Sequence, residues 1–248
     1  MLIAVDGTGP FLDKTYYKEM ANSFVKQVRN ECPEGLKYYF RGASLAGEEC
    51  MATAYSAFGV IIRTYRDMKK KGEESFKLFL TGYSRGGATV IYLARLLQTS
   101  LPDIEIECMA LFDAVDRSSL SFVDIIPGNV KICYHAIRDP KVQSRWYFGN
   151  CGLKIDPPGK MDPPKTFFAT HAGLGGMPWT GDHPTKEVQN SKFNVAEYFR
   201  KYPMAAKVGF PSEATIEVPL ITEAQDKAGS AAVRSWMWNN MRKHGMVS

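Results

Sequence analysis

The sequence lacks the features that define several large classes of protein. No apolar run approaches the ~18 residues that a helix needs to cross a membrane, and no internal repeat or low-complexity tract is present. Lys69-Lys70-Lys71 is the longest cationic run, and the formal net charge of the 248 residues is only +5. We interpret this triplet as a solvated helix end, and we expect no nucleic-acid partner.

Cysteine is infrequent, and its spacing does not indicate metal binding. The five cysteines are an odd number without a C-x-x-C pair, so we expect neither a disulfide framework nor a zinc site. The carboxylates are scattered and no His/Asp cluster has ligand spacing, so we expect no metal. No secretory signal follows Met1. The expected location is therefore cytoplasmic, with export that needs no N-terminal signal left open.

Strand-like and helix-like segments alternate along the chain. Short apolar runs bounded by turn residues predict strands, and apolar residues at helical spacing predict helices. The alternation predicts one α/β domain over 1–248, a three-layer sandwich with a mostly parallel sheet and helices on both faces. The predicted strands are 2–5, 36–40, 77–80, 104–112, 130–137 and 166–170, and the predicted helices are 16–30, 47–70, 88–97, 190–201 and 230–244.

Residues 143–165 interrupt this alternation. The segment is rich in glycine, proline and aromatic residues, and its apolar residues follow neither the helical nor the strand period. Long connections of this kind inside a compact domain are often functional. We therefore expect a long loop or a lid here.

The most informative motif is Gly82-Tyr83-Ser84-Arg85-Gly86, a G-x-S-x-G pentapeptide. A predicted strand precedes it and an apolar helix follows it, which is the context of a nucleophile elbow. The glycines permit the close backbone contacts of such a turn. Ser84 would then stand at the edge of the sheet as a nucleophile. The alternative is a glycine-rich strand-to-helix turn with a structural serine.

A serine nucleophile needs a base, and the chain has only four histidines. His171 is our first choice, because it follows the last predicted strand and should lie at the same sheet edge as Ser84. His183 is the second choice, with a helix-start residue as its other interpretation. His135 lies inside an apolar strand and is expected to be a hydrogen-bonded core histidine, whereas His244 is expected to be solvated.

The base in turn needs a carboxylate that orients it. Asp139 is our first choice, because it ends the strand predicted at 130–137 and follows the second strand after the nucleophile strand, in the order Ser, acid, His. Asp113 is the alternative and ends the preceding strand, with Asp116 close behind it. Each could instead be a strand-end turn residue, because aspartate is common there.

Two backbone N–H groups should face the charge that develops during attack by the serine. One is expected from Arg85, which follows the nucleophile at the start of a helix. The turn after the first strand should supply the other, and Gly7 and Thr8 are our choices there. Gly7-Thr8-Gly9 is only a fragment of the dinucleotide-binding fingerprint, since Leu12 stands where its last glycine would be. We expect no cofactor.

These motifs, in this order, resemble a bacterial and fungal family of α/β-hydrolase-like proteins that includes phospholipase effectors of type VI secretion systems. The elbow of that family reads Gly-Phe-Ser-Arg-Gly-Ala, and the resemblance covers roughly positions 2–176 of this chain. It rests on the stretches Asp6-Gly7-Thr8, Gly82-Tyr83-Ser84-Arg85-Gly86-Gly87, Phe112-Asp113-Ala114-Val115, Tyr134-His135-Ala136-Ile137-Arg138-Asp139 and His171-Ala172-Gly173-Leu174-Gly175-Gly176.

The resemblance implies a serine esterase, lipase or phospholipase with a Ser-Asp-His triad. Ser84 and His171 match the family pattern, and both Asp113 and Asp139 match its aspartates. The implied partner is an ester or lipid small molecule. Two other functions stay open: a non-catalytic binding module of the same fold, and an acyltransferase or thioesterase that uses the same triad.

A lipid substrate would favour an apolar rim around the site and a transient contact with a membrane surface. Residues of the predicted lid and of the segment after His171 could supply this rim, or they could pack as ordinary loop aromatics. They are Trp146, Tyr147, Phe148, Met177, Pro178 and Trp179.

Overall fold

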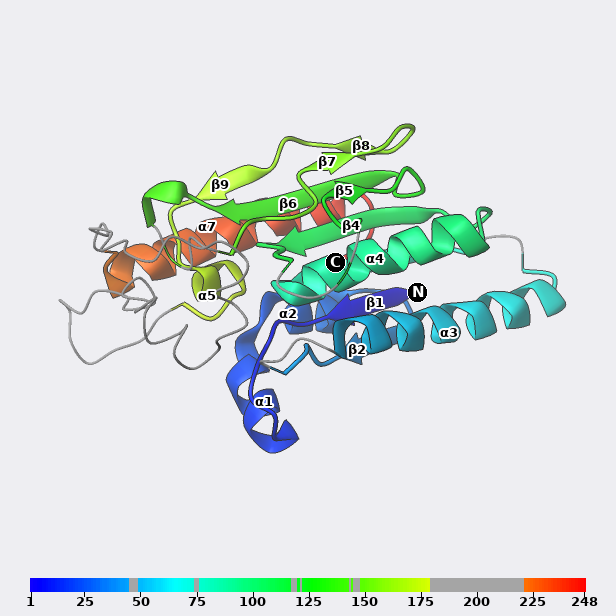
Figure 1. Cartoon of the computed structure of the whole chain (residues 1–248), viewed down its shortest axis with the longest axis horizontal. Helices are drawn as coiled ribbons and strands as arrows, with labels where there is room; N and C mark the ends of the chain where they lie inside the picture. The colour runs from blue at the N-terminus through cyan, green and yellow to red at the C-terminus, as the bar shows by residue number, and fades with distance from the viewer. Residues whose placement is uncertain are drawn as a thin grey trace, which may run out of the picture.

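Seven strands form the central sheet, and every strand pairing within it is parallel (Figure 1). The order is β2-β1-β3-β4-β6-β8, and β9 also pairs with β6. A separate pair is formed by β5 (Ile125–Ile126) and β7 (Lys154–Ile155). The strands of the main sheet are β1 (Leu2–Val5), β2 (Lys37–Phe40), β3 (Leu78–Tyr83), β4 (Ile106–Phe112), β6 (Ile132–Arg138), β8 (Lys160–Met161) and β9 (Lys165–Phe167).

The computed structural model describes residues 1–44, 49–73, 76–116, 120, 122–142, 144, 148–178 and 221–248. Five expectations fall outside these ranges: the helix at 190–201, the second-choice base His183, and the three rim residues Trp146, Tyr147 and Trp179. All six predicted strands are present, and their ends lie within three residues of the predicted ones.

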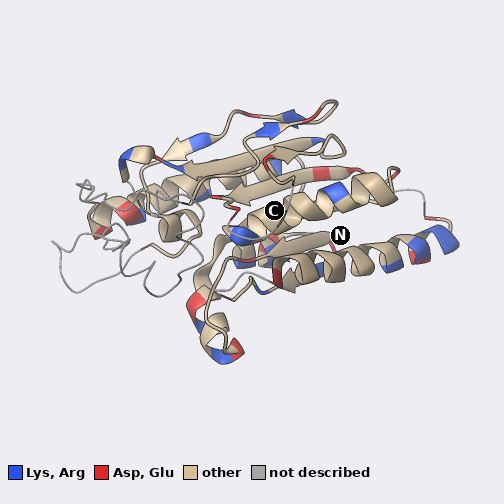
Figure 2. Cartoon of the chain, viewed as in Figure 1, with Lys and Arg blue, Asp and Glu red and all other residues tan. Residues whose placement is uncertain are grey.

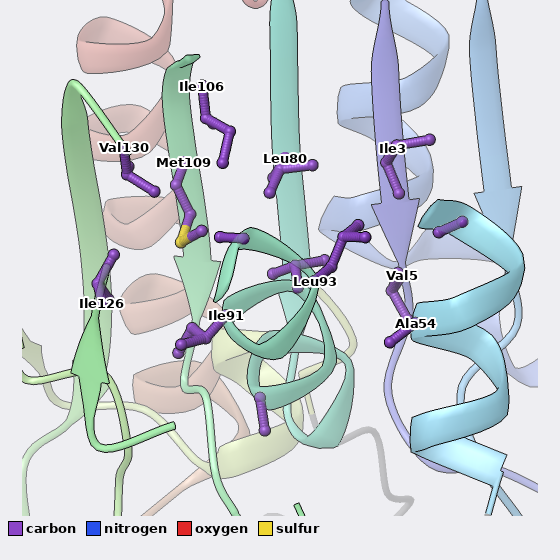
Figure 3. Packing of buried hydrophobic residues seen from close by; sticks show 14 of the residues in the cluster. Ile3, Val5, Ala54, Leu80, Ile91, Leu93, Ile106, Met109, Ile126 and Val130 are labelled. Atoms are coloured by element: carbon purple, nitrogen blue, oxygen red, sulfur yellow. The ribbon is translucent and has the colours of Figure 1, made fainter. Parts of the chain in front are cut away.

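Helices cover both faces of the sheet, as the alternation of segments predicts. On one face, α3 (Glu49–Lys70) and α4 (Arg85–Ser100) enclose a core cluster with sheet residues such as Ile3 and Leu80 (Figure 3). On the other face, α2 (Phe24–Glu31) and α7 (Glu223–Arg242) enclose a second cluster with Leu2 and Phe79. Neighbouring residues of a strand thus enter opposite cores, and the three-layer α/β fold is confirmed.

The helix predicted at 16–30 is divided in two. The structure has α1 (Asp13–Glu19), a 3₁₀ turn η1 (Met20–Asn22), and then α2. Ser23 causes the break, because its side chain accepts the Lys26 N–H as the N-cap of α2 and also donates to the carboxylate of Asp6. Apolar periodicity continues across the break, which is why the spacing alone predicts one helix.

The expectation of a loop or lid over 143–165 is wrong for the later part of that segment. Its described residues include β7, which pairs with β5, and β8, which pairs with β6 in the main sheet; Lys165 begins β9, which also pairs with β6. These strands have only two or three residues, which is too short to show the alternation of a strand. At the other end of the chain, α7 begins at Glu223 rather than at 230, because Thr222 and Gln225 form a capping box.

Charged residues are spread over the molecule. Figure 2 shows Lys and Arg on α1, α3, α4 and the strands β7 to β9, with acidic residues among them. No helix in the described ranges is both long and apolar enough to cross a membrane. The five cysteines are buried and free.

Gly86 allows the contact between α4 and β1 to be tested, and Gly59 provides a control. A Cβ at Gly86 would overlap the carbonyl oxygens of Val5 and Asp6, whereas a Cβ at Gly59 in α3 would meet nothing closer than Arg63 Nη1 at 3.6 Å. We expect Gly86→Ala to lower the free energy of unfolding by about 1–3 kcal/mol. Gly59→Ala should raise it by about 0.5–1 kcal/mol, because alanine favours a helix. Urea denaturation of both variants measures this, and an unchanged Gly86→Ala protein would contradict the close approach.

Candidate active site

Ser84 occupies a strained turn between β3 and α4. Its backbone has φ 54° and ψ −129°, a conformation that residues with a side chain rarely adopt. The turn is held by a hydrogen bond from the Ser84 N–H to the Phe112 carbonyl at 3.0 Å. A Cβ at Gly82 would overlap the backbone of Gly86 and Gly87, so the turn is sharp only because these positions are glycine. This is the geometry of a nucleophile elbow, although Ser84 is only 4% exposed.

His171 begins the short helix α5 (His171–Leu174), just after β9. Its Nε2 lies 2.9 Å from the Ser84 Oγ, so the structure brings together the predicted nucleophile and the first-choice base. The ring packs against the Tyr83 ring, with centroids 5.0 Å apart, and the Tyr83 hydroxyl donates to the His171 carbonyl. These contacts leave the imidazole little freedom to turn away from the serine.

Asp113 lies against the other ring nitrogen of His171. Its Oδ2 is 2.6 Å from His171 Nδ1, and the residue is fully buried just after β4, with φ 45°. Asn150 donates to the other carboxylate oxygen at 2.8 Å. Asp113, His171 and Ser84 therefore form one continuous chain of hydrogen bonds.

Asp139, our first choice for this position, lies elsewhere. It is partly exposed after β6, and its Oδ1 accepts the Lys141 N–H at 2.9 Å in the turn η2 (Pro140–Val142). The order of strands explains the difference. β4 is the direct neighbour of β3, whereas β6 is one strand further away, so Asp113 is nearer to Ser84. The geometry thus selects the alternative, Asp113, and leaves Asp139 as the strand-end turn residue.

A buried cation accompanies Asp113. The Nη1 of Arg138, at the end of β6, donates to Asp113 Oδ2 at 2.6 Å, and Arg138 is only 8% exposed. Burial alone raises the pKa of Asp113, but the Arg138 charge and the hydrogen bonds from His171 and Asn150 outweigh it, so the net shift of the pKa is downward. Asp113 is therefore a carboxylate at neutral pH.

His135 is the buried core histidine that its strand predicts. Its Nε2 accepts the Ala114 N–H at 3.0 Å, so its Nδ1 carries the proton and donates to the Gly152 carbonyl at 3.2 Å. Burial lowers its pKa to about 4, which keeps the ring neutral. The hydrogen bond from Ala114 to His135 fixes the residue after Asp113, and so it helps to hold the Asp113 carboxylate in place.

The turn after β1 does not present both of the amides that the sequence predicts. The Gly7 N–H donates to the Asp6 carboxylate at 2.8 Å inside the turn, so it is not directed at a substrate. The Thr8 N–H makes no hydrogen bond to any described residue, and the Thr8 Oγ1 accepts from Arg85 Nε at 2.6 Å. Arg85 is the first residue of α4. A side-chain hydrogen bond thus ties Thr8 to Arg85 beside Ser84.

Asp6 was not predicted as part of the site, yet it organises this turn. The carboxylate is fully buried and accepts from the Gly7 N–H, the Ser23 hydroxyl and the Tyr39 hydroxyl, the last at 2.9 Å. Burial raises its pKa above the ordinary value in spite of these bonds. The Tyr16 hydroxyl donates to the Gly7 carbonyl at 2.8 Å. The turn is therefore fixed from several sides.

The loop that carries His171 is held by residues that are distant in sequence. The buried Asp226 of α7 accepts the Thr170 N–H at 2.6 Å and the Thr170 hydroxyl at 2.9 Å. Thr170 in turn caps α5 by accepting the Gly173 N–H. Ser144 Oγ accepts the His171 N–H at 3.0 Å. No local pattern marks Asp226 or Ser144, and the sequence reasoning missed both.

Nothing in the described ranges is arranged to hold a metal: they contain no group of three or more His, Cys, Asp or Glu side chains with that geometry. Of the expected rim residues, Phe148 lies against the imidazole, with its ring edge-on to His171 at 5.6 Å. Met177 and Pro178 are half-buried.

The buried neutral state of His135 gives the stability of the fold a defined pH dependence. Between pH 6.5 and 4 the unfolded chain binds a proton at His135 that the folded chain does not, so the free energy of unfolding rises with pH in this window. A pKa moved from 6.5 to about 4 corresponds to at most about 3 kcal/mol, lost as the pH falls. Urea titrations of the wild type and of His135→Gln measure this. The variant should have a flatter profile, and parallel profiles would contradict the assignment.

Comparisons with known proteins assign no family to this chain. No protein-family model matches the chain, and no curated protein does. Among solved structures, it is similar to the crystal structure of an uncharacterized protein from Pseudomonas aeruginosa, with 12% sequence identity and a TM-score of 0.47. That alignment covers 95% of this chain and 50% of the other, so this chain spans about half the length of its neighbour.

Proposed function

We propose that the protein is a serine hydrolase that cleaves a carboxylic ester. The observation that carries the proposal is the chain of hydrogen bonds through Asp113, His171 and Ser84, with contacts of 2.6 and 2.9 Å. The strained turn at Ser84 adds support, because such strain is typical of a nucleophile held in position for attack.

In the proposed reaction, His171 Nε2 removes the proton from the Ser84 hydroxyl as Oγ attacks the ester carbonyl carbon. Asp113 accepts a hydrogen bond from the Nδ1–H of His171 and stabilises the imidazolium that forms. The imidazolium then gives its proton to the leaving alcohol oxygen as the C–O bond breaks, which leaves an acyl group on Ser84. A water molecule attacks this acyl-enzyme, again with His171 as base, and the acid is released as the serine regains its proton.

The oxyanion of each tetrahedral intermediate would be stabilised by backbone amides. The Arg85 N–H is the first amide of α4 and follows the nucleophile, so it combines a donor with the positive end of the helix dipole. Thr8 supplies the second amide from the turn after β1. This assignment replaces the expected Gly7, whose N–H is engaged by Asp6.

A lipid-like ester is the substrate class we favour. Phe11 and Leu12 follow the turn that carries Thr8, and they are 80% and 68% exposed. Large apolar side chains exposed together are typical of surfaces that contact lipid or other apolar partners. The family that this chain resembles includes phospholipases, and their substrates are also lipid esters. The proposal therefore includes a transient contact between this edge and a membrane surface.

Labelling with a fluorophosphonate probe tests the nucleophile. We expect the wild type to be labelled and to hydrolyse p-nitrophenyl esters, and we expect Ser84→Ala to lose the label and at least about 10⁴-fold in kcat. Ser100→Ala is a matched control, since Ser100 is exposed at the end of the same helix, and it should keep both properties. Absence of labelling in the folded wild type would count against the proposal. An ester series of increasing chain length would distinguish an esterase from a lipase.

A pair of aspartate variants tests the orienting acid. Asp113→Asn should lower kcat by about 10³–10⁴-fold, because the amide would favour the wrong tautomer of His171. Asp139→Asn should leave kcat within about twofold, because that side chain lies in a surface turn. The kinetics are measured with one ester at a saturating concentration. The reverse result would restore Asp139 as the acid.

A further inference from the structure

Arg138 has an unusual place beside the proposed catalytic residues. Its Nη1 lies 2.6 Å from Asp113 Oδ2 and 2.9 Å from His171 Nδ1, and the same two atoms of Asp113 and His171 are 2.6 Å apart. A single guanidinium nitrogen thus completes a triangle with the carboxylate oxygen and the ring nitrogen. All three side chains are buried, with at most 7% of any of them exposed.

The contacts of this triangle depend on the tautomer of His171. A guanidinium group is a permanent cation that can only donate hydrogen bonds. Its contact with Nδ1 is therefore a hydrogen bond only when Nδ1 carries no proton. In that tautomer Nε2–H faces Ser84 and cannot accept the proton of the serine. In the productive tautomer, Nδ1–H donates to Asp113, and Arg138 competes for the same oxygen.

The charge balance of the group differs from that of an isolated Asp–His pair. Without Arg138, protonation of the ring would turn a buried charge of −1 into a neutral ion pair. With Arg138 present, Asp113 is already neutralised, and protonation of the ring creates a net buried charge of +1. Burial disfavours an uncompensated charge, so the guanidinium opposes formation of the imidazolium.

We propose that Arg138 is a positioning residue that shares one carboxylate oxygen of Asp113 with His171 and keeps the base neutral, and so able to activate Ser84, at more acidic pH than Asp113 alone would allow. This inference rests on the proposed function for its catalytic meaning. It adds to that function a tuning of the working pH range.

Other titratable or charged groups lie on the elements around the ring. The Tyr83 ring from β3 packs directly against it, with centroids 5.0 Å apart. The others contact its neighbours: Arg85 of α4 follows Ser84 and donates to Thr8, His135 of β6 accepts the Ala114 N–H, and Asp226 of α7 accepts the Thr170 N–H.

The first test is the pH profile of kcat/KM for a p-nitrophenyl ester, in the wild type, Arg138→Gln and Arg138→Lys. Arg138→Gln should move the acidic limb of the profile upward by about one pH unit, and Arg138→Lys, which keeps the charge, should move it by less than half as much. An equal loss of rate at every pH, with an unmoved limb, would show a merely structural role and overturn the proposal. Equal shifts in both variants would also overturn it, because the charge would then be irrelevant.

The second test reads the base without any catalysis. NMR titration of the His171 ring in Ser84→Ala protein, assigned by comparison with His171→Gln, gives its pKa with and without Arg138→Gln. The pKa should rise when the guanidinium is removed, and an unchanged or lower pKa would overturn the inference. A wild type that is not labelled by fluorophosphonate would defeat the proposed function, whereas this titration would still decide the role of Arg138.

Discussion

The whole site depends on one fully buried carboxylate, that of Asp113. Four groups converge on it: the ring of His171, the guanidinium of Arg138, the amide of Asn150 and, more weakly, the Arg138 N–H. A charge so far from water would be costly without such partners. Because these partners come from β6, from α5 and from the segment between β6 and β7, the carboxylate also fixes how those segments meet at the end of the sheet.

Close backbone contacts around β1 give the opposite side of the site its shape. The turn after β1 is enclosed by glycines, since a Cβ at Gly42 would overlap the Gly7 carbonyl and one at Gly86 would overlap the Asp6 carbonyl. The Tyr16 hydroxyl bridges the same region, because it donates to the Gly7 carbonyl and accepts the Gly42 N–H at 2.6 Å. The two sides of the site are thus rigid for different reasons: charge pairing on one side and the absence of side chains on the other.

The layers of the fold and the meeting of Ser84 with His171 could be predicted because their signals are local. A run of buried residues marks each central strand, and the elbow is a contiguous pentapeptide. The choice between Asp113 and Asp139 is not local, since it depends on β4 lying beside β3. The prediction that the Gly7 N–H faces the substrate is wrong for a similar reason. The side chain of Asp6 accepts this N–H, and residue spacing alone does not reveal that contact. Arg138 at a strand end resembles an ordinary surface residue until its partners are seen.

The helix α7 makes the site depend on segments that are far apart in the sequence. Asp226 holds Thr170, and Thr170 caps the short helix that begins with His171. During synthesis, β1, Ser84 and His171 all leave the ribosome well before residue 226 does. The loop that carries His171 would therefore lack this anchor until α7 has been made and docked. A nascent or interrupted chain would carry Ser84 without a fixed histidine beside it.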